Sequence, residues 1–126
     1  HDNATAFDYF HIENPNWTPH QQKRAASFGL QLILISQGMA FIHCGQEFFR
    51  TKDEIENTYN VSDTINRLDW TRAIHYKEHI EFIQELIAFR KNNPILSQDN
   101  YESIQQTCYF YWLTEFVFRY QVISEE

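Results

Sequence analysis

One helix, apolar almost all the way round, is the feature that most constrains how this chain can fold. Between Phe28 and Ile35 every side chain is apolar except Gly29 and Gln31. At about 100° per residue these apolar side chains point in almost every direction around a helix axis. A helix of this kind is typical of a protein interior, covered by other elements on all sides.

The limits of this helix follow from its flanking residues. Thr18, Pro19 and Gln21 have the order of an N-cap, a first-turn proline and the polar partner of a capping box. They predict a helix that begins at Pro19 and runs to about Gln37. Gly38 would then occupy the C′ position, where glycine commonly ends a helix.

A short apolar segment follows the helix directly. Met39 to Cys44 has the length and the Phe and Ile content of a short buried strand, and Gly45 is expected to end it. A helix, a glycine and an apolar strand in this order are typical of an α/β connection in a parallel sheet.

The next stretch, Gln46 to about Trp70, is polar and aperiodic. It is far longer than the usual connection of about 2–6 residues, and long connections in compact domains are commonly functional. A second helix is predicted from Thr71 to Asn92, amphipathic and lying on a core. Asn93 and Pro94 are expected to stop it.

The end of the chain has a different pattern. A short helix is predicted from about Asp99 to Gln106, followed by strands from Tyr109 to Trp112 and from Phe116 to Ile123. Alternation places Phe116, Phe118, Tyr120 and Val122 on one strand face. No further helix follows, so this tail is expected to begin an antiparallel β unit.

Composition excludes several classes of function. The 126 residues carry a formal net charge of −7, which argues against a general nucleic-acid binder because such proteins need a basic face. The longest aliphatic run, Leu32 to Ile35, is far short of the roughly 20 residues of a membrane span, so no membrane partner is expected. Cys44 and Cys108 form no C-x-x-C pair and are expected to be buried free thiols. The compartment is left open.

Two clusters could suggest a metal. His75 to His79 matches H-x-x-E-H, an inverted zinc-peptidase signature. That interpretation needs a third ligand and a wet site, whereas both histidines fall on the apolar side of the helix. Two partly buried histidines making ordinary hydrogen bonds are therefore expected, with no metal and no cofactor. The acidic cluster at residues 53–56 is either a solvated loop face or a cation site.

One ordered series of residues is distinctive as a whole. Its core is the stretch from Gly38 to Lys52, and its remaining members are His1, Asp2, Asn3, Thr5, Asp8, Ser36, Gln37, Asn57, Tyr59, Asn60, Asp63, Asn66, Asp69, Trp70 and Arg72. The series resembles the C-terminal part of the catalytic barrel of type I pullulanases, α-1,6-glucan debranching enzymes of glycoside hydrolase family 13 in the α-amylase superfamily. The stretch from Gly38 to Lys52 is the most specific part and resembles the eighth barrel strand and the loop after it.

The resemblance implies a fold class and a domain organisation. The fold class is α/β, with residues 1–96 forming the end of strand 7, helix 7, strand 8 and helix 8 of a (β/α)8 TIM barrel. Residues 97–126 would begin an all-β C-terminal domain. Barrel active sites lie at the carboxyl ends of the strands, which is where the long connection from residue 46 would lie.

The resemblance also implies residue roles. Asp2 would be the catalytic carboxylate that stabilises the transition state, and His1 would bind hydroxyls of the same glucose unit. The remaining substrate-binding residues would be Asn3, Arg50, Asn57, Tyr59 and Asn60.

A retaining glycosidase also needs a nucleophile and an acid/base carboxylate. In the family these follow earlier barrel strands, so the chain, which starts at His1, is expected to be a fragment of a retaining α-1,6-glucosidase. Its expected partners are an α-glucan and the remainder of its own catalytic domain, and the fragment alone is expected to be inactive. Two alternatives remain: an isoamylase-like hydrolase of the same superfamily, and a non-catalytic helical module whose helix docks in a partner's groove.

Overall fold

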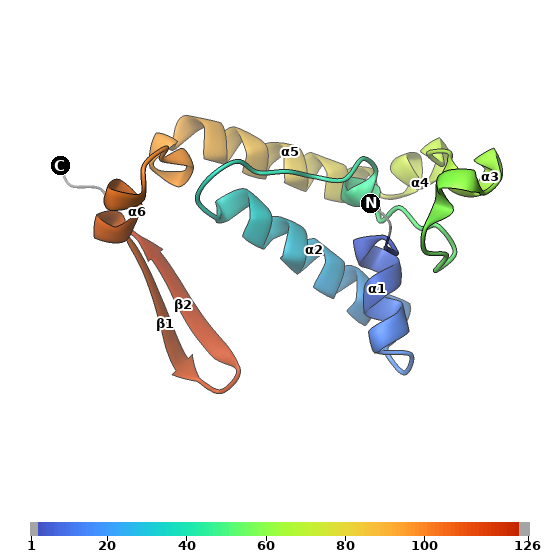
Figure 1. Ribbon diagram of the computed structural model, residues 1–126, viewed down its shortest axis with the longest axis horizontal. Helices are drawn as coiled ribbons and strands as arrows, with labels where there is room; N and C mark the ends of the chain where they lie inside the picture. Colours follow the sequence, from blue (N-terminus) through green and yellow to red (C-terminus); the bar gives the residue numbers. More distant parts are fainter. Residues whose placement is uncertain (1–2, 124–126) are drawn as a thin grey trace.

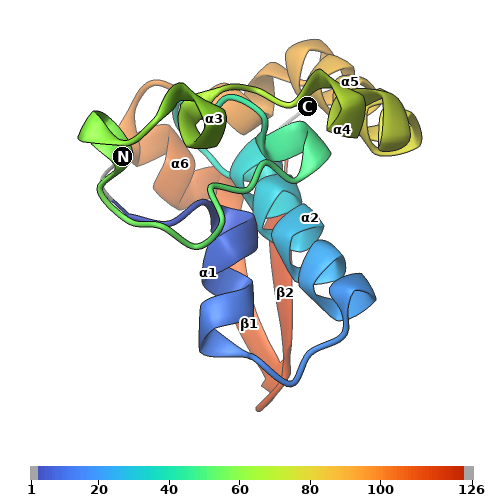
Figure 2. The ribbon, with the colours of Figure 1, turned by 90° about the vertical axis from the view of Figure 1, so that its right-hand side faces the viewer.

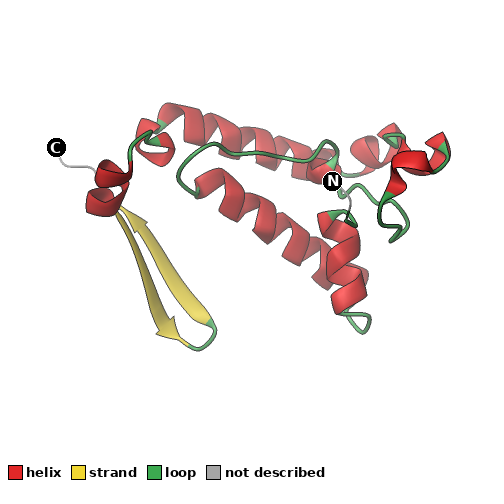
Figure 3. Ribbon diagram, viewed as in Figure 1, coloured by secondary structure: helices red, strands yellow, loops and turns green. Residues whose placement is uncertain are grey.

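The computed structural model describes residues 3–123, which form a largely helical body with one β-hairpin (Figures 1 and 3). Two long helices, α2 and α5, form the centre of the body. The helices are α1 (Ala6–Glu13), α2 (Pro19–Ile35), α3 (Asp63–Asn66), α4 (Trp70–His75), α5 (Lys77–Asn92) and α6 (Tyr101–Thr107); the 3-10 turns are η1 (Gln46–Phe48), η2 (Thr58–Asn60) and η3 (Pro94–Ser97); the strands are β1 (Cys108–Thr114) and β2 (Val117–Val122).

The predicted start of α2 is confirmed. The Thr18 hydroxyl accepts from the backbone N–H of Gln21, and the Gln21 side chain accepts from the backbone N–H of Thr18, which completes the capping box. The predicted end is two residues too late, because the helix ends at Ile35. Arg90 of α5 donates to the carbonyls of Leu34 and Ser36 at 2.7 and 2.6 Å, so a side chain satisfies the end of the helix.

Replacing the N-cap tests how much this start contributes. In Thr18→Ala the local opening free energy of the first turn of α2 is expected to fall by about 1 kcal/mol, because an N-cap hydroxyl is lost. Hydrogen exchange of the α2 amides in the intact protein measures it. Thr114→Ala, in the hairpin, is the control and should leave α2 unchanged; equal exchange in both variants would contradict the capping role.

The prediction that α2 is covered on all sides is wrong for this structure. Its buried residues are Gln22, Ala26, Leu30 and Leu34, all on one face, whereas Phe28 is 51% exposed. On the side that carries Phe28, the described residues leave the helix partly exposed. The core lies between the two long helices and contains Leu30, Leu34 and Ile83, with Ala40, Ile42, Leu86 and Ile87 packed against it.

The predicted strand from Met39 to Cys44 is also wrong. The segment has no regular structure and runs as a coil beside α2 and α5 (Figure 1). A strand needs a hydrogen-bonded neighbour, and in the described part of the chain the only sheet is β1–β2. The side chains nevertheless alternate as in a strand: Ala40 and Ile42 pack on the core, and Met39 and Phe41 are 95% and 72% exposed.

The second predicted helix is divided in two. Tyr76 leaves helical geometry, with φ −105° and ψ 30°, and separates α4 from α5. Its ring lies in T-shaped contact with Phe49, at 5.0 Å between centroids, and the cationic groups of Lys23 and Arg72 lie over it at 5.3 and 5.5 Å. These tertiary contacts hold Tyr76 in place. They were not predicted, because the periodicity of apolar side chains in the segment carries no information about them.

The predicted C-terminal helix and two strands are present, with bounds that differ by one or two residues, and Phe116 lies in the turn and not in the second strand. Helix α6 begins after Asn100, whose side chain accepts from the Ser103 N–H, and the two strands pair in an antiparallel hairpin. Phe118 on β2 contacts Phe28 of α2, with 6.4 Å between ring centroids, but the hairpin otherwise extends away from the helices (Figure 1). In the view of Figure 2 the hairpin lies behind α1 and α2. Within residues 3–123, none of the helices could cross a lipid bilayer.

Candidate functional site

The long polar connection is an ordered loop built from η1, η2 and α3. Gly45 introduces it in a left-handed conformation, with φ 90°. A Cβ at this position would lie 2.9 Å from the Cβ of Arg50, so glycine is required. Four non-glycine residues of the loop also have positive φ, which is uncommon and concentrates at functional sites; they are Phe49, Asp53, Glu54 and Asn57.

Arg50 lies at the centre of the loop. Its guanidinium donates to the carbonyl of Asn66, to the carbonyl of Cys44 at 3.4 Å and to Nε2 of His43 at 3.3 Å. Its Nε is buried without a partner in the structure. Arg50 therefore holds the two ends of the loop together, a role the sequence did not indicate.

The other predicted substrate-binding residues are displayed on the surface. Asn57, Tyr59 and Asn60 lie together around η2, all exposed, with 82% of Tyr59 accessible to solvent. Asn3 is exposed and precedes α1. The structure thus brings Asn57, Tyr59 and Asn60 together and gives Arg50 a different environment. His1 and Asp2 lie outside the described residues.

A small polar pocket of about 200 Å³ opens within the loop. Its charged lining is mainly basic, although the chain as a whole is acidic. Asp69 also caps α4, and the hydrogen bonds that Thr71 donates hold the pKa of its carboxyl below the usual value. The charged residues are Arg50, Lys52, Arg67, Arg72, Asp53 and Asp69.

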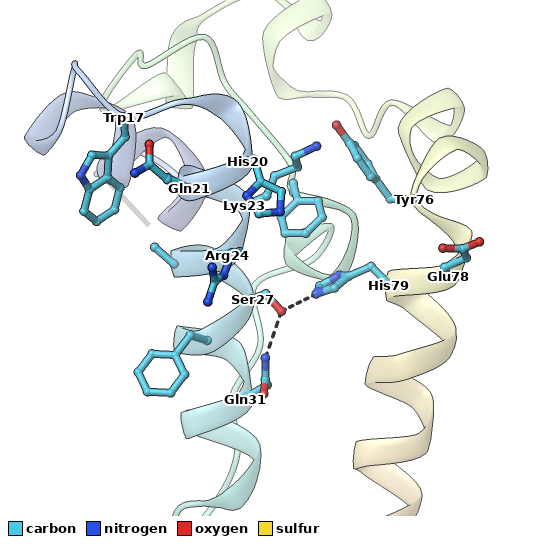
Figure 4. A pocket seen from close by; sticks show the side chains of 13 residues that line it. Trp17, His20, Gln21, Lys23, Arg24, Ser27, Gln31, Tyr76, Glu78 and His79 are labelled. Carbon is cyan, nitrogen blue, oxygen red and sulfur yellow. Dashed lines mark hydrogen bonds between the residues drawn. The ribbon is translucent and has the colours of Figure 1, made fainter. Parts of the chain in front are cut away.

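A larger open groove, about 900 Å³, lies between α2 and the α4–α5 junction (Figure 4). At its base Gln31 donates to the Ser27 hydroxyl at 3.1 Å, and Ser27 lies 2.9 Å from Nε2 of His79. Nδ1 of His79 donates to the carbonyl of Glu47 at 2.7 Å. Both ring nitrogens of His79 are thus engaged by protein groups, so this histidine connects α2, α5 and η1.

This geometry weighs against the zinc interpretation. His79 makes the ordinary hydrogen bonds that were expected, but His75 is exposed and lies in α4, beyond the break at Tyr76. Two ligands on one continuous helix face are therefore not formed. Among residues 3–123 no group of three or more His, Cys, Asp or Glu side chains is placed to hold a metal ion.

The remaining predictions about titratable groups have mixed outcomes. Cys44 and Cys108 are free, but Cys44 is exposed and Cys108 only half-buried, so the prediction that both are buried is wrong. The acidic cluster at residues 53–56 is exposed, and the Glu54 carboxylate contacts Nδ1 of His11 on α1.

Burial and nearby positive charges make the protonation of His43 couple to folding. Burial, and then the positive charges of Arg50 and Lys52, hold the pKa of His43 below its ordinary value, while Glu47 has a smaller opposing effect. The neutral ring is therefore favoured in the folded state. As the pH falls below about 6.5, the unfolded chain takes up this proton first and the folded state loses stability.

We expect the melting temperature of the intact protein to fall as the pH is lowered from 7 toward the pKa of His43 in the folded state. This fall is expected to be smaller in His43→Gln. His75→Gln, at an exposed site, is the control and should keep the wild-type dependence. Thermal melts across this pH range measure the effect. An unchanged pH dependence in His43→Gln would contradict the assignment.

Comparison with known proteins gives a consistent result, although no family model matches the chain. It is 37% identical over 122 residues to a pullulanase of Bacillus subtilis (strain 168), covering 97% of this chain and 17% of the relative. It is 38% identical over 87 residues to an isoamylase of a Flavobacterium species, covering 69% of this chain and 11% of the relative.

Solved structures agree with the sequence relatives. A pullulanase from Anoxybacillus sp. LM18-11 in complex with maltotriose superposes with a TM-score of 0.92 at 30% identity, over 97% of this chain and 18% of that one. The type I pullulanase of Bacillus subtilis strain 168 with maltose gives 0.90 at 36% identity, over 96% of this chain and 17% of that one. The chain thus spans less than a fifth of the proteins it matches.

Proposed function

From two observations we propose that the chain is part of a debranching glycoside hydrolase: it is similar in sequence to one segment of pullulanases and isoamylases, and it is similar in fold to pullulanases. The whole enzyme would hydrolyse α-1,6 bonds of pullulan, glycogen or starch dextrins with retention of configuration. The observation that carries the proposal is the match to pullulanases over nearly the whole chain in both sequence and structure.

The order of α2, an extended apolar segment and α5 supports the proposal that this part of the chain belongs to a β/α barrel. We propose that α2 is helix 7 and that α5 belongs to helix 8 of a (β/α)8 barrel, with residues 97–126 beginning a β domain. Met39 to Cys44, a coil in this structure, would pair as strand 8 only against barrel strands contributed by the rest of the enzyme. Those missing barrel elements would also explain the exposed Met39, Phe41 and Phe28.

The catalytic proposal assigns two residues to the glucose unit at the cleaved bond. Asp2 would stabilise the oxocarbenium-like transition state, and His1 would bind hydroxyls of the same sugar. Asn3 and the exposed group Asn57, Tyr59 and Asn60 would contact the glucan. A tyrosine ring offers a sugar an apolar face with a polar edge.

Arg50 would act at the base of the loop, beside the small basic pocket. The nucleophile and the acid/base carboxylate would be supplied by other parts of the enzyme. No cofactor is part of this chemistry, because protein carboxylates perform both steps.

Pullulanase is favoured over isoamylase as the specific activity. The Bacillus subtilis pullulanase aligns with 97% of the chain, including the hairpin, whereas the Flavobacterium isoamylase aligns with 69%. The maltotriose and maltose bound in the related structures are α-glucan oligosaccharides, and they support a glucan as the substrate.

The stereochemistry of hydrolysis tests the proposed mechanism. The intact enzyme is incubated with pullulan in D2O, and the anomeric proton of the newly released reducing end is followed by NMR. A retaining enzyme first releases the α-anomer, which then mutarotates. Initial release of the β-anomer would contradict the mechanism.

A further inference from the structure

A buried chain of polar contacts connects α1 to the loop. The Asp8 side chain, 2% exposed, accepts from the Thr51 hydroxyl at 2.5 Å and from the backbone N–H of Lys52 at 2.8 Å. Asp8 also lies within the cap of its own helix, since its backbone N–H donates to the hydroxyl of Thr5. One carboxylate thus fixes a loop segment more than forty positions away in the sequence.

The contacts continue through Lys52 to η2. Lys52 is 8% exposed, and its ammonium donates to the Thr58 hydroxyl at 2.7 Å. Thr58, 3% exposed, donates in turn to Oδ1 of Asn66 at 2.7 Å. The Asn66 amide donates to the carbonyls of Thr58 and Val61 at 2.7 and 3.1 Å, which closes the turn.

These contacts define where one exposed side chain lies. Thr58 is buried, and Tyr59, the next residue, is 82% exposed. A buried polar group that loses its partner is costly, so these linked hydrogen bonds favour a single conformation of the turn. Asp8 follows Asn3 by only a few residues, so the same contacts set the loop relative to the segment that carries Asn3.

We propose that Asp8, Lys52, Thr58 and Asn66 are positioning residues of the glucan-binding face, holding Tyr59 and its neighbours in register with the N-terminal segment. They contact no substrate themselves, because they are buried or engaged with one another. The inference rests on the proposed function. Small displacements of a substrate-contacting group lower the rate strongly, so loss of one buried hydroxyl is expected to be visible in catalysis.

A double-mutant cycle in the intact enzyme tests this. Thr58→Val removes the hydroxyl at nearly constant volume, and Tyr59→Ala removes the side chain it positions. Each variant is expected to lower kcat/KM on pullulan about tenfold, and the double variant to lose no more than either alone, because both act through Tyr59. Thr58→Ser, which keeps the hydroxyl, should restore most of the activity, and Thr114→Val in the hairpin should leave it unchanged.

The outcomes separate two failures. Two results would overturn the positioning role while the proposed function stands, provided that the wild-type enzyme cleaves pullulan. In the first, the losses of kcat/KM in the two single variants multiply in the double variant. In the second, Thr58→Val lowers kcat/KM less than about twofold while Tyr59→Ala lowers it tenfold. If the wild-type enzyme cleaves no α-glucan, both fall. Should Thr58→Val not fold, Asp8→Asn replaces it in the same cycle, since the amide keeps one acceptor oxygen.

Discussion

Asp2→Asn is expected to lower kcat of the intact enzyme on pullulan by about a hundredfold or more, which corresponds to roughly 3 kcal/mol of transition-state stabilisation. The substitution keeps the size of the side chain and removes its negative charge. An oxocarbenium-like transition state carries positive charge on the sugar ring, so a fixed carboxylate stabilises it more than the neutral ground state. KM should change much less than kcat.

Asp99→Asn is a matched control, because this carboxylate is exposed and lies outside the loop. Its kcat should remain within about twofold of wild type. A loss of less than about tenfold in Asp2→Asn would remove the role assigned to Asp2, since a catalytic carboxylate contributes more than that.

The isolated 126-residue chain is expected to show no hydrolysis of pullulan and no cooperative thermal melt. Its fully buried apolar residues are few, and large apolar side chains are exposed on several elements, which is unusual for a protein that folds alone. The buried set is Ala26, Leu30, Leu34, Phe48, Phe49, Ile83 and Leu96. The most exposed are Met39, Phe41, Tyr59, Ile74, Tyr101 and Phe116.

Two measurements on the purified chain check this prediction. Binding of an apolar fluorescent dye should be strong at low temperature and fall little on heating, because the apolar faces are already open. Near-ultraviolet circular dichroism should show weak aromatic signals. A sharp melting transition with all probes coincident would show that the chain folds independently and would contradict the prediction.

The local signals in the sequence predicted local structure well. The capping box at Thr18 identified the start of α2, and the alternation of Phe118, Tyr120 and Val122 identified the second hairpin strand, although Phe116 lies in the turn before it. Helix α1 was missed, although Thr5 and Asp8 have the spacing of an N-cap and its partner. Eight residues with mixed polarity give too weak a periodicity to be distinguished from a loop.

The errors occurred where an element depends on distant partners. Met39 to Cys44 has the composition and alternation of a strand, but a strand forms only against a neighbour, and residues 3–123 provide none for it. Tyr76 interrupts a strongly amphipathic segment because of contacts with Lys23 and Phe49, which are far away in the sequence.

For the candidate site too, residues selected from the sequence differ from contacts that only the fold creates. The resemblance to pullulanases selected Asn57, Tyr59 and Asn60, and these lie together on the surface. The spacing of Asp8 and Lys52 in the sequence does not predict their hydrogen bond, because buried polar contacts leave no periodic pattern in a sequence. Arg50 shows the same limit, since its contacts with both ends of the loop are set by the fold.

Identifying the bond that the intact enzyme cleaves tests the central claim most directly. Pullulan consists of maltotriose units joined by α-1,6 bonds, so chromatography of the products reports the linkage cut. The account predicts maltotriose as the main product and no matching release of short sugars from amylose. A trisaccharide end product that retains an α-1,6 bond, or no products from pullulan and glycogen, would contradict it.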